Sequence, residues 1–439
     1  MSTDTDLGAF RAMKGSRILI MTYGTRGDVE PMLALALGLK RAGMAVAIAT
    51  STRFAEWIGD YGIDALPISD DLLAMMDTPD GRMLLEGSSS VLARIRAGVR
   101  MQRAATPINV RMMFECASAA DEFQPDLIVY HPKMFAGPHI AEKLAIPAVL
   151  AVFQPLFVPT ADFPLAGLPD SRLPGWNRAT YNLVALSMRF YRKRINAFRR
   201  DELGLEPVDA GGAVTMPPGA GRIPVLHAVS PHVIPRPADW PAHAHLTGYW
   251  PLQRGAEYAP PEPLRAFLEA GPPPVYAGFG SMMSADPAAL AELLAQAFRK
   301  AGVRGVIGAG WAGLDTAASG DVFVTPPVPH GWLFPQTAAI IHHGGAGTTA
   351  AAFRAGVPSI ICPFIGDQPF WARRAHQLGV APPPLPRSKL TAEGLAVSIR
   401  DAVSNPAMRA KAKDLGKKLE SETGVDNAVA LIAGLLPSA

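Results

Sequence analysis

Short apolar runs alternate with amphipathic segments along the first third of the chain. The run RILIMTY (17–23) precedes EPMLALALGLKRAG (30–43), and the run AVAIAT (45–50) precedes RFAEWIGDYG (53–62). The runs DLIVYHP and PAVLAVF repeat this order around AGPHIAEKLA (136–145). Apolar strands of this length separated by amphipathic helices are typical of βαβ units with a parallel sheet covered on both faces. We therefore predict a Rossmann-like domain at the amino-terminal end.

The alternation weakens between 154 and 222 and restarts after a Pro- and Gly-bearing linker at 245–264. The first part of the interruption is rich in Pro and apolar residues, and a helical pattern follows it at 181–205. After the linker come PPVYAGFGS, DVFVTPP and PSIICPF, separated by helical segments. A chain of 439 residues exceeds one ordinary core. We therefore predict two α/β domains joined by one linker.

The composition indicates a packed globular protein, because 49% of the residues are hydrophobic and 18% are charged. A net charge of +3 and the lack of any nucleic-acid-binding signature exclude nucleic acid as an expected partner. Cys116 and Cys362 lie in apolar surroundings, which favours reduced thiols over a disulfide. The sequence has no signal-peptide pattern and no apolar run long enough to span a membrane, so we expect a cytoplasmic protein.

Two basic stretches with interleaved apolar residues leave two interpretations open. They are RIRAGVRMQR (94–103) and RFYRKRINAFRR (189–200). Such a pattern forms a solvated helix face or lies on an anionic membrane surface. Peripheral membrane contact through these basic helices therefore stays a hypothesis.

A glycine-rich turn at 342–349 is the strongest chemical signal in the sequence. The apolar strand AAII ends at His342 and His343, three glycines follow within five residues, and Thr348 and Thr349 enter a helix. Free N–H groups and the helix dipole make such a turn a site for a phosphate or diphosphate. An ordinary structural turn is the alternative. A zinc pair is not expected, because adjacent strand residues point to opposite faces.

Asp367 and Gln368 form a second polar element after the strand SIICPF. A carboxylate beside a carboxamide offers acceptors and donors for several adjacent sugar hydroxyls. A capping turn is the simpler interpretation of either residue alone. Together with the anion turn, the pair indicates a nucleotide-sugar, with its diphosphate on the helix and its sugar at Asp367 and Gln368.

The stretch HHGGAGTTAAAFRAGVPSIICPFIGDQPFW resembles the donor signature of the UDP-glycosyltransferase superfamily, which has the GT-B fold. Further motifs, in the same order, include GTRGDVEPMLALALGLKRAG, SPHVIPRPADWPAHAHLTGYW and PPVYAGFGSM. They are similar to the sterol 3-β-glucosyltransferase branch and to bacterial natural-product glycosyltransferases. The resemblance implies two Rossmann-like domains facing across a cleft. It implies an acceptor domain at 1–245, a linker at 246–262, a donor domain at 263–415, and a last helix at 416–439 that crosses back to the first domain.

The resemblance also assigns roles to site residues. It implies that the donor diphosphate is bound by Ser281, His343, Gly345, Gly347 and Thr348. It implies that the sugar is bound by Asp367 and Gln368, and that the base packs at Val328. Many plant relatives have a Trp and a Glu where this chain has Thr325 and Ala351, and without the Glu the choice between UDP and dTDP donors stays open.

Asp28, in GTRGDVEP, follows the first strand and has two interpretations. As a helix cap, its carboxylate would accept hydrogen bonds from backbone N–H groups of its own helix. As a general base, which the resemblance implies, it would lie at the carboxyl end of the strand, where open α/β sheets bind ligands, and have a partner only when an acceptor hydroxyl arrives.

These elements and the resemblance together imply an inverting, metal-independent hexosyltransferase that needs no cofactor besides its nucleotide-sugar substrate. The expected donor is UDP-glucose, and the expected acceptor is a hydroxyl of a lipophilic molecule such as a sterol, triterpenoid or polyketide. A non-hydrolysing nucleotide-sugar epimerase and an inactive lipid- or nucleotide-binding protein are the alternatives.

Some side chains have no assigned partner and are expected to be structural, namely His131, His139, His243 and His245. The aromatic residues Phe153, Phe157, Phe163 and Trp176 wall an acceptor pocket or pack in the core.

Overall fold

A computed structural model of the chain describes residues 15–76, 78, 91–155, 157–171, 173–208, 223–252, 258–279, 287–308 and 320–437. The chain divides into two compact units. The first consists of Met1–Thr78, Gly98–Gln253 and Thr423–Ala439, and the second of Pro79–Ala97 and Arg254–Glu422.

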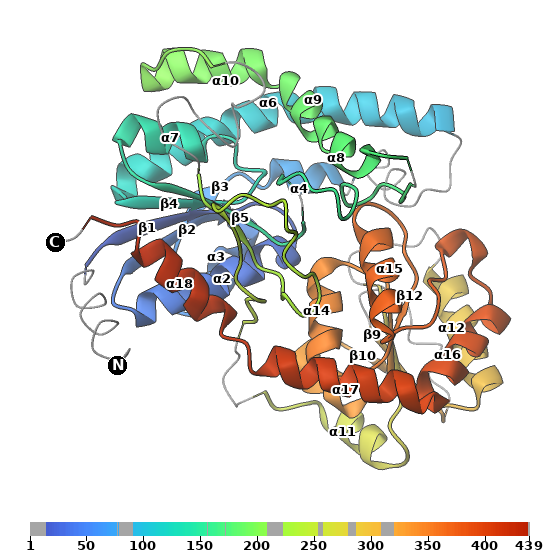
Figure 1. The fold of residues 1–439 in the computed structure, drawn as a ribbon. Coiled ribbons are helices and arrows are strands. Elements are labelled where there is room, and N and C mark those ends of the chain that lie inside the picture. Colours follow the sequence, from blue (N-terminus) through green and yellow to red (C-terminus); the bar gives the residue numbers. More distant parts are fainter. Residues whose placement is uncertain are drawn as a thin grey trace. The chain divides into compact units, whose positions relative to one another are not determined.

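The first unit contains a parallel sheet of seven strands in the order β3-β2-β1-β4-β5-β6-β7 (Figure 1). Its strands are β1 (Arg17–Met21), β2 (Ala45–Ser51), β3 (Asp64–Ile68), β4 (Leu127–Tyr130), β5 (Ala148–Val152), β6 (Val225–His227) and β7 (Ala244–Leu246). Its helices are α2 (Arg26–Arg41), α3 (Ala55–Gly59), α4 (Asp71–Met76), most of α6 (Val91–Phe123), α7 (Gly137–Leu144), α8 (Trp176–Thr180), α9 (Asn182–Arg189), α10 (Arg192–Phe198) and α18 (Gly424–Ala433). This arrangement confirms the predicted Rossmann-like α/β fold.

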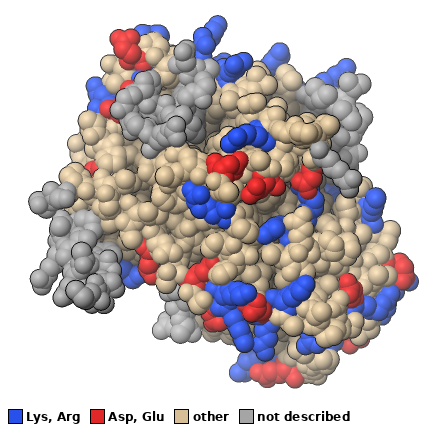
Figure 2. Space-filling view, in the orientation of Figure 1, with Lys and Arg blue, Asp and Glu red and all other residues tan. Residues whose placement is uncertain are grey.

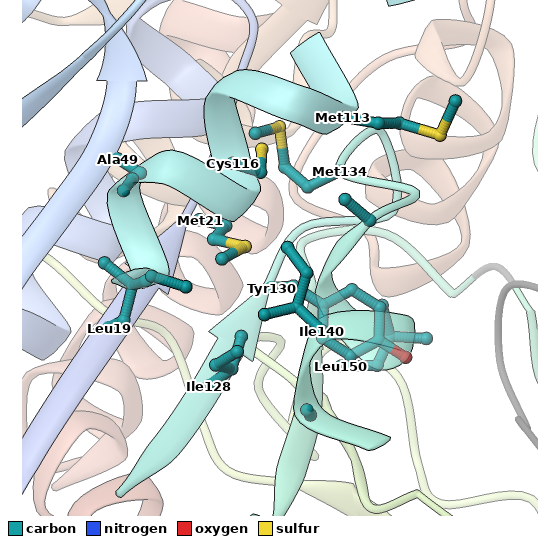
Figure 3. Packing of buried hydrophobic residues seen from close by; sticks show 14 of the residues in the cluster. Leu19, Met21, Ala49, Met113, Cys116, Ile128, Tyr130, Met134, Ile140 and Leu150 are labelled. Carbon is teal, nitrogen blue, oxygen red and sulfur yellow. The ribbon is translucent and has the colours of Figure 1, made fainter. Parts of the chain in front are cut away.

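Alternate residues of β1 enter the two cores on the two faces of this sheet. Leu19 and Met21 join the cluster formed with α6 and α7, whereas Ile18 and Ile20 join the cluster formed with α2 and α18. Figure 3 shows the first cluster, in which Cys116 packs among methionines and the strand side chains. Cys116 and Cys362 are both buried free thiols.

The last helix, α18, packs against α2 in the first unit (Figure 1). Gly38 of α2 allows this approach, because a Cβ atom at this position would collide with Val425 and Val429. Val429 and Ile432 are buried in the same core as β1. The preceding helix, α17 (Pro406–Glu420), belongs to the second unit.

The second unit contains a parallel sheet of five strands in the order β10-β9-β8-β11-β12. The strands are β8 (Val275–Gly278), β9 (Gly305–Gly308), β10 (Val322–Thr325), β11 (Ala339–His342) and β12 (Ser359–Ile361). Helices cover both faces, namely α11 (Glu262–Glu269), α12 (Pro287–Ala301), α13 (His330–Leu333), α14 (Ala346–Arg354), α15 (Gln368–Leu378), α16 (Ala392–Ser404) and α17. Residues of β11 alternate between two cores, with Ile341 in one and Ile340 in the other.

Among the described residues, no helix is both long enough and apolar enough to cross a membrane.

Candidate functional site

Asp28 is the third residue of α2, directly after the turn that leaves β1. Its Oδ2 atom accepts a hydrogen bond of 2.8 Å from the N–H of Thr25, the N-cap residue. The preceding Gly24 has φ +144°, and a Cβ atom there would collide with the Asp28 carboxylate and with the ammonium group of Lys133. The turn therefore needs glycine at position 24 for both conformation and space.

Two residues that follow β4 complete the surroundings of Asp28. The Lys133 Nζ lies 3.1 Å from Asp28 Oδ2, and the His131 Nε2 lies 3.5 Å from Asp28 Oδ1. Strands β1 and β4 are neighbours, and the His131 N–H donates to the carbonyl oxygen of Met21 at the end of β1. The strand order reverses between β1 and β4, which is the place where open α/β sheets bind ligands.

The charges around Asp28 favour its ionised form. Burial raises the pKa of Asp28. Lys133, His131 and the Thr25 N–H together lower it by more than burial raises it, so the net pKa is below its ordinary value. Burial lowers the pKa of His131 to about 4, against the opposing effect of Asp28. The His131 Nδ1 accepts from the Lys133 N–H at 3.3 Å, so the neutral ring carries its proton on Nε2, facing Asp28. Asp28 is thus an anion beside a neutral imidazole at physiological pH.

This geometry corrects two expectations. Asp28 was expected to lack a partner until an acceptor arrives, but its Oδ2 accepts from the Thr25 N–H and pairs with Lys133. The cap geometry is therefore present, because the third residue of a helix can reach the N-cap amide. His131 was expected to be structural, but it lies beside Asp28. The position of His131 after a strand that neighbours β1 is the sequence signal that would have identified it.

In the second unit, the turn after β11 exposes the amino-terminal end of α14. The helix begins at Ala346, and its first internal hydrogen bond runs from the Thr349 N–H to the Gly345 carbonyl oxygen. The N–H groups before Thr349 therefore have no partner within the helix. A Cβ atom at Gly347 would meet nothing within 4 Å, so the space above this position is open. Thr348 is half-buried, whereas the hydroxyl of Thr349 is buried without a hydrogen-bond partner.

The two histidines of this turn differ in their roles. The His342 Nδ1 accepts from the Gly344 N–H at 3.1 Å, and burial lowers the pKa of His342 well below its ordinary value. The ring of His343 covers Gly345, where a Cβ atom would lie 2.5 Å from the His343 Nε2. Burial lowers the pKa of His343 to about 4, so its ring is neutral at physiological pH. His342 fixes the turn, and His343 lies beside the open helix end.

Asp367 and Gln368 lie close to this turn because β11 and β12 are paired. A Cβ atom at Gly344 would lie 3.2 Å from the carbonyl oxygen of Gln368. Asp367 Oδ2 accepts from the Trp371 Nε1 at 2.7 Å. The Gln368 Oε1 accepts from the N–H groups of Phe364 and Ile365, so this oxygen holds the loop. The carboxamide oxygen is therefore engaged within the protein, and the remaining polar group of the side chain is the Nε2 donor.

The other residues expected to bind the nucleotide-sugar donor, or to lie beside it, have different surroundings in the structure. Ser281 lies outside the described residues. Val328 is partly buried and packs against the core that contains Ile340 and Ala352. Thr325 is buried, and its hydroxyl donates to the carbonyl oxygen of Pro326.

The aromatic residues proposed for an acceptor pocket have neighbours in the first unit. Phe153 stacks on His131 with ring centroids 5.6 Å apart. Phe157 and Phe163 pack against the core below β1 and β4, and the Trp176 Nε1 donates to the carbonyl oxygen of Pro169. Phe153 is thus the one that lies next to the Asp28 group.

Comparison with known proteins places the chain in a family. Residues 18–161 match the model described as glycosyltransferase family 28 N-terminal domain, and residues 314–431 match the erythromycin biosynthesis protein CIII-like C-terminal domain. The sterol 3-beta-glucosyltransferase UGT80B1 of Arabidopsis thaliana is 34% identical over 430 residues, which cover 96% of this chain and 68% of that protein. The chain belongs to the UDP-glycosyltransferase superfamily. It is a glycosyltransferase.

Further members of this superfamily differ from the chain in length. A sterol 3-beta-glucosyltransferase of Neosartorya fischeri is 35% identical over 441 residues, which cover 96% of the chain but 30% of that protein. The chain therefore spans about two thirds of the plant relative and less than a third of the fungal one.

Solved glycosyltransferase structures share the fold. The glycotransferase of kitacinnamycin has a TM-score of 0.71 and 20% identity, covering 97% of this chain and 100% of that chain. The glycosyltransferase VinC, crystallised in complex with DTDP, has a TM-score of 0.65 and 22% identity, covering 95% of this chain and 99% of that chain. These similarities confirm the α/β GT-B fold.

Proposed function

We propose that this glycosyltransferase moves a hexose from a nucleoside-diphosphate sugar to a hydroxyl of a lipophilic acceptor, with inversion. The observation that carries the proposal is the ionised Asp28 at the reversal of strand order, with one carboxylate oxygen still available. The Oδ2 atom is engaged by Thr25 and Lys133, whereas Oδ1 has the His131 Nε2 at 3.5 Å. That distance exceeds a normal hydrogen bond, so Oδ1 can accept a proton from a bound hydroxyl.

The proposed reaction balances as one displacement. Asp28 Oδ1 takes the proton of the acceptor hydroxyl while the hydroxyl oxygen forms a bond to the anomeric carbon. The bond from that carbon to the diphosphate oxygen breaks, and the diphosphate leaves with the electron pair from the opposite face. Such a single displacement inverts the configuration of the anomeric carbon.

We assign the donor to the second unit and the acceptor to the first. The open N–H groups before Thr349 and the dipole of α14 suit the two phosphates, and His343 and Thr348 add side-chain donors. On this proposal the diphosphate is stabilised without a metal or a further cofactor. Asp367 and the Gln368 Nε2 would hold sugar hydroxyls, and Ser281 and Val328 would contact the diphosphate and the base.

The names of the relatives support the substrate classes. Proteins named sterol 3-beta-glucosyltransferase match across 96% of the chain, which favours glucose as the sugar and a sterol as the acceptor. Triterpenoids and polyketides are the further lipophilic acceptors of this proposal. UDP-glucose is the proposed donor. The VinC complex with DTDP and the lack of a carboxylate at Ala351 make dTDP-sugars the second donor class to test.

A mass-spectrometric screen of lipophilic acceptors against UDP- and dTDP-sugars tests this proposal. We expect acceptors to gain the mass of one hexose and nucleoside diphosphate to be released only when an acceptor is present. Conversion of the nucleotide-sugar to its epimer without an acceptor would instead identify an epimerase. Binding of donor without turnover across a broad acceptor panel would identify a binding protein.

A further inference from the structure

Exposed apolar side chains concentrate on the helical layer formed by α6 and α8–α10 of the first unit. Seven large hydrophobic side chains are exposed among the described residues, and six of them belong to α6 or to the segment 173–190. Leu183, Leu186 and Phe190 are 48%, 49% and 68% exposed, and their spacing of three and four residues places them on one face of α9 and its end. Such a stripe on a helix surface is unusual in a protein that has no partner there.

Basic residues predominate on α8–α10 and on α6 before its last turns, which contain Glu115, Asp121 and Glu122. Neither 91–114 nor 173–200 contains an Asp or a Glu, although the whole chain has 38 acidic and 41 basic residues. Arg189, Arg192 and Lys193 are exposed, and no acidic partner is recorded for them among the described residues. Figure 2 shows several basic side chains along the upper edge of the first unit, over the helices labelled α10, α6 and α9 in Figure 1, and an acidic group at the left end of that edge.

Hydrogen bonds join α6 to the α9–α10 segment, so the apolar stripe and the cations share one surface. Tyr191, between α9 and α10, accepts from the Gln102 Nε2 at 2.9 Å and from the Asn109 Nδ2 at 3.3 Å. Val99, which is 47% exposed, lies one turn before Gln102 on α6. The ring of Phe114 in α6 also packs edge to face against the ring of Phe198 in α10.

We propose that this surface docks the protein on an anionic phospholipid bilayer. The apolar stripe of α9 would enter the headgroup boundary, and the cations around it would face lipid phosphates, as in interfacial amphipathic helices. A second copy of the chain is disfavoured as the occupant, because two surfaces of the same positive sign repel each other. The docking uses neither Asp28 nor the turn after β11, so it can be tested apart from catalysis.

Flotation with vesicles of phosphatidylcholine, with and without phosphatidylglycerol, tests the docking surface. One variant removes the apolar stripe (Leu186→Ser with Phe190→Ser), and a second reverses two charges (Arg192→Glu with Lys193→Glu). A matched control makes the same kinds of change on exposed residues of the second unit (Val397→Ser with Lys417→Glu). Circular dichroism and thermal unfolding verify that each variant is folded, as expected for exposed positions.

We expect the native protein and the control to float with the anionic vesicles and to be released by salt. Each reversed cation should weaken binding by roughly fivefold, and the apolar variant should weaken it by a comparable amount. Equal binding to both vesicle types, or equal losses in the control, would overturn the proposal. Loss only in the charge variant would indicate a general polyanion surface, and a concentration-dependent dimer abolished by the apolar variant would indicate a second copy. Either result would also overturn it.

Discussion

The two carboxylate oxygens of Asp28 have different surroundings. One oxygen, Oδ2, holds the turn through the Thr25 N–H and pairs with Lys133, while Oδ1 faces His131. A helix cap and a general base are therefore not mutually exclusive at this residue. The cap fixes the orientation of the carboxylate, and this orientation leaves one oxygen for an acceptor hydroxyl.

Replacement of Lys133 by Met should move the acid limb of the pH–rate profile. Lys133 is the foremost group that lowers the pKa of Asp28, and burial alone would raise it. Without the cation, the Asp28 pKa rises, so the base becomes protonated at a higher pH and kcat/KM falls earlier on acidification. The pH dependence of kcat/KM, measured for both proteins, checks this.

The variant Lys133→Arg serves as the matched control, because it keeps the positive charge. Its acid limb should stay close to that of the native protein, and an unmoved limb in Lys133→Met would contradict the role given to this pair. Acid stability has the same sign. Because the folded-state pKa of Asp28 is lowered, its ionised form stabilises the fold above the unfolded-chain pKa, and this is lost as the pH falls through the folded-state pKa.

At the scale of elements, the glycines in the turn after β11 differ in whether the protein itself requires a residue without a side chain. Gly344 has φ +90° and abuts Ile361 and Gln368, and Gly345 lies under the His343 ring. Gly347 has neither constraint, since a Cβ atom there would reach open space. The fold alone therefore does not explain the glycine at position 347. A ligand that approaches the backbone at this position would explain it.

The variant Gly347→Ala should therefore separate folding from donor binding. We expect thermal stability to be unchanged or slightly raised, by up to about 1 kcal/mol, because alanine favours a helix more than glycine. We expect UDP affinity to fall by about tenfold or more, since the added methyl group would occupy the proposed diphosphate site. Calorimetric titration with UDP measures this, and unchanged UDP affinity would contradict the assignment of the turn.

The elements themselves were largely predictable from the sequence, and their contacts were not. The alternation of Ile18, Leu19, Ile20 and Met21 between two cores follows from a strand buried on both faces. The glycine turn was predictable as a turn because glycines that follow an apolar strand allow the tight entry into a helix. The use of the Gln368 oxygen by its own loop was not readable, because a carboxamide before a helix fits both a ligand and a backbone partner.

At the scale of the whole molecule, the chain ends by returning to the first unit. Helix α18 buries Val429, Ile432 and Leu436 against the core that contains β1 and α2. Removal of residues 423–439 should destabilise the first unit by on the order of 5 kcal/mol, from the lost burial of these side chains. Urea unfolding of the truncated and full chains, with UDP binding as a probe of the second unit, checks this. Equal unfolding midpoints would contradict the packing.

Long-range neighbours set the limit of what the sequence predicts. His131 and Lys133 are more than 100 residues from Asp28, and only the adjacency of β1 and β4 brings them together. Motif order along the chain identified the fold and the family, because several motifs occurred in the expected sequence. The local charge around the base depends instead on residues outside those motifs, so it required the structure.

The variant Asp28→Asn tests the central claim most directly. The amide keeps the size of the side chain but cannot accept the acceptor proton, so glycosyl transfer should fall by about a hundredfold or more. Binding of UDP, which we assign to the second unit, should be unchanged, and circular dichroism should show an intact fold. Transfer close to the native rate, in a variant that still binds UDP, would contradict Asp28 as the general base.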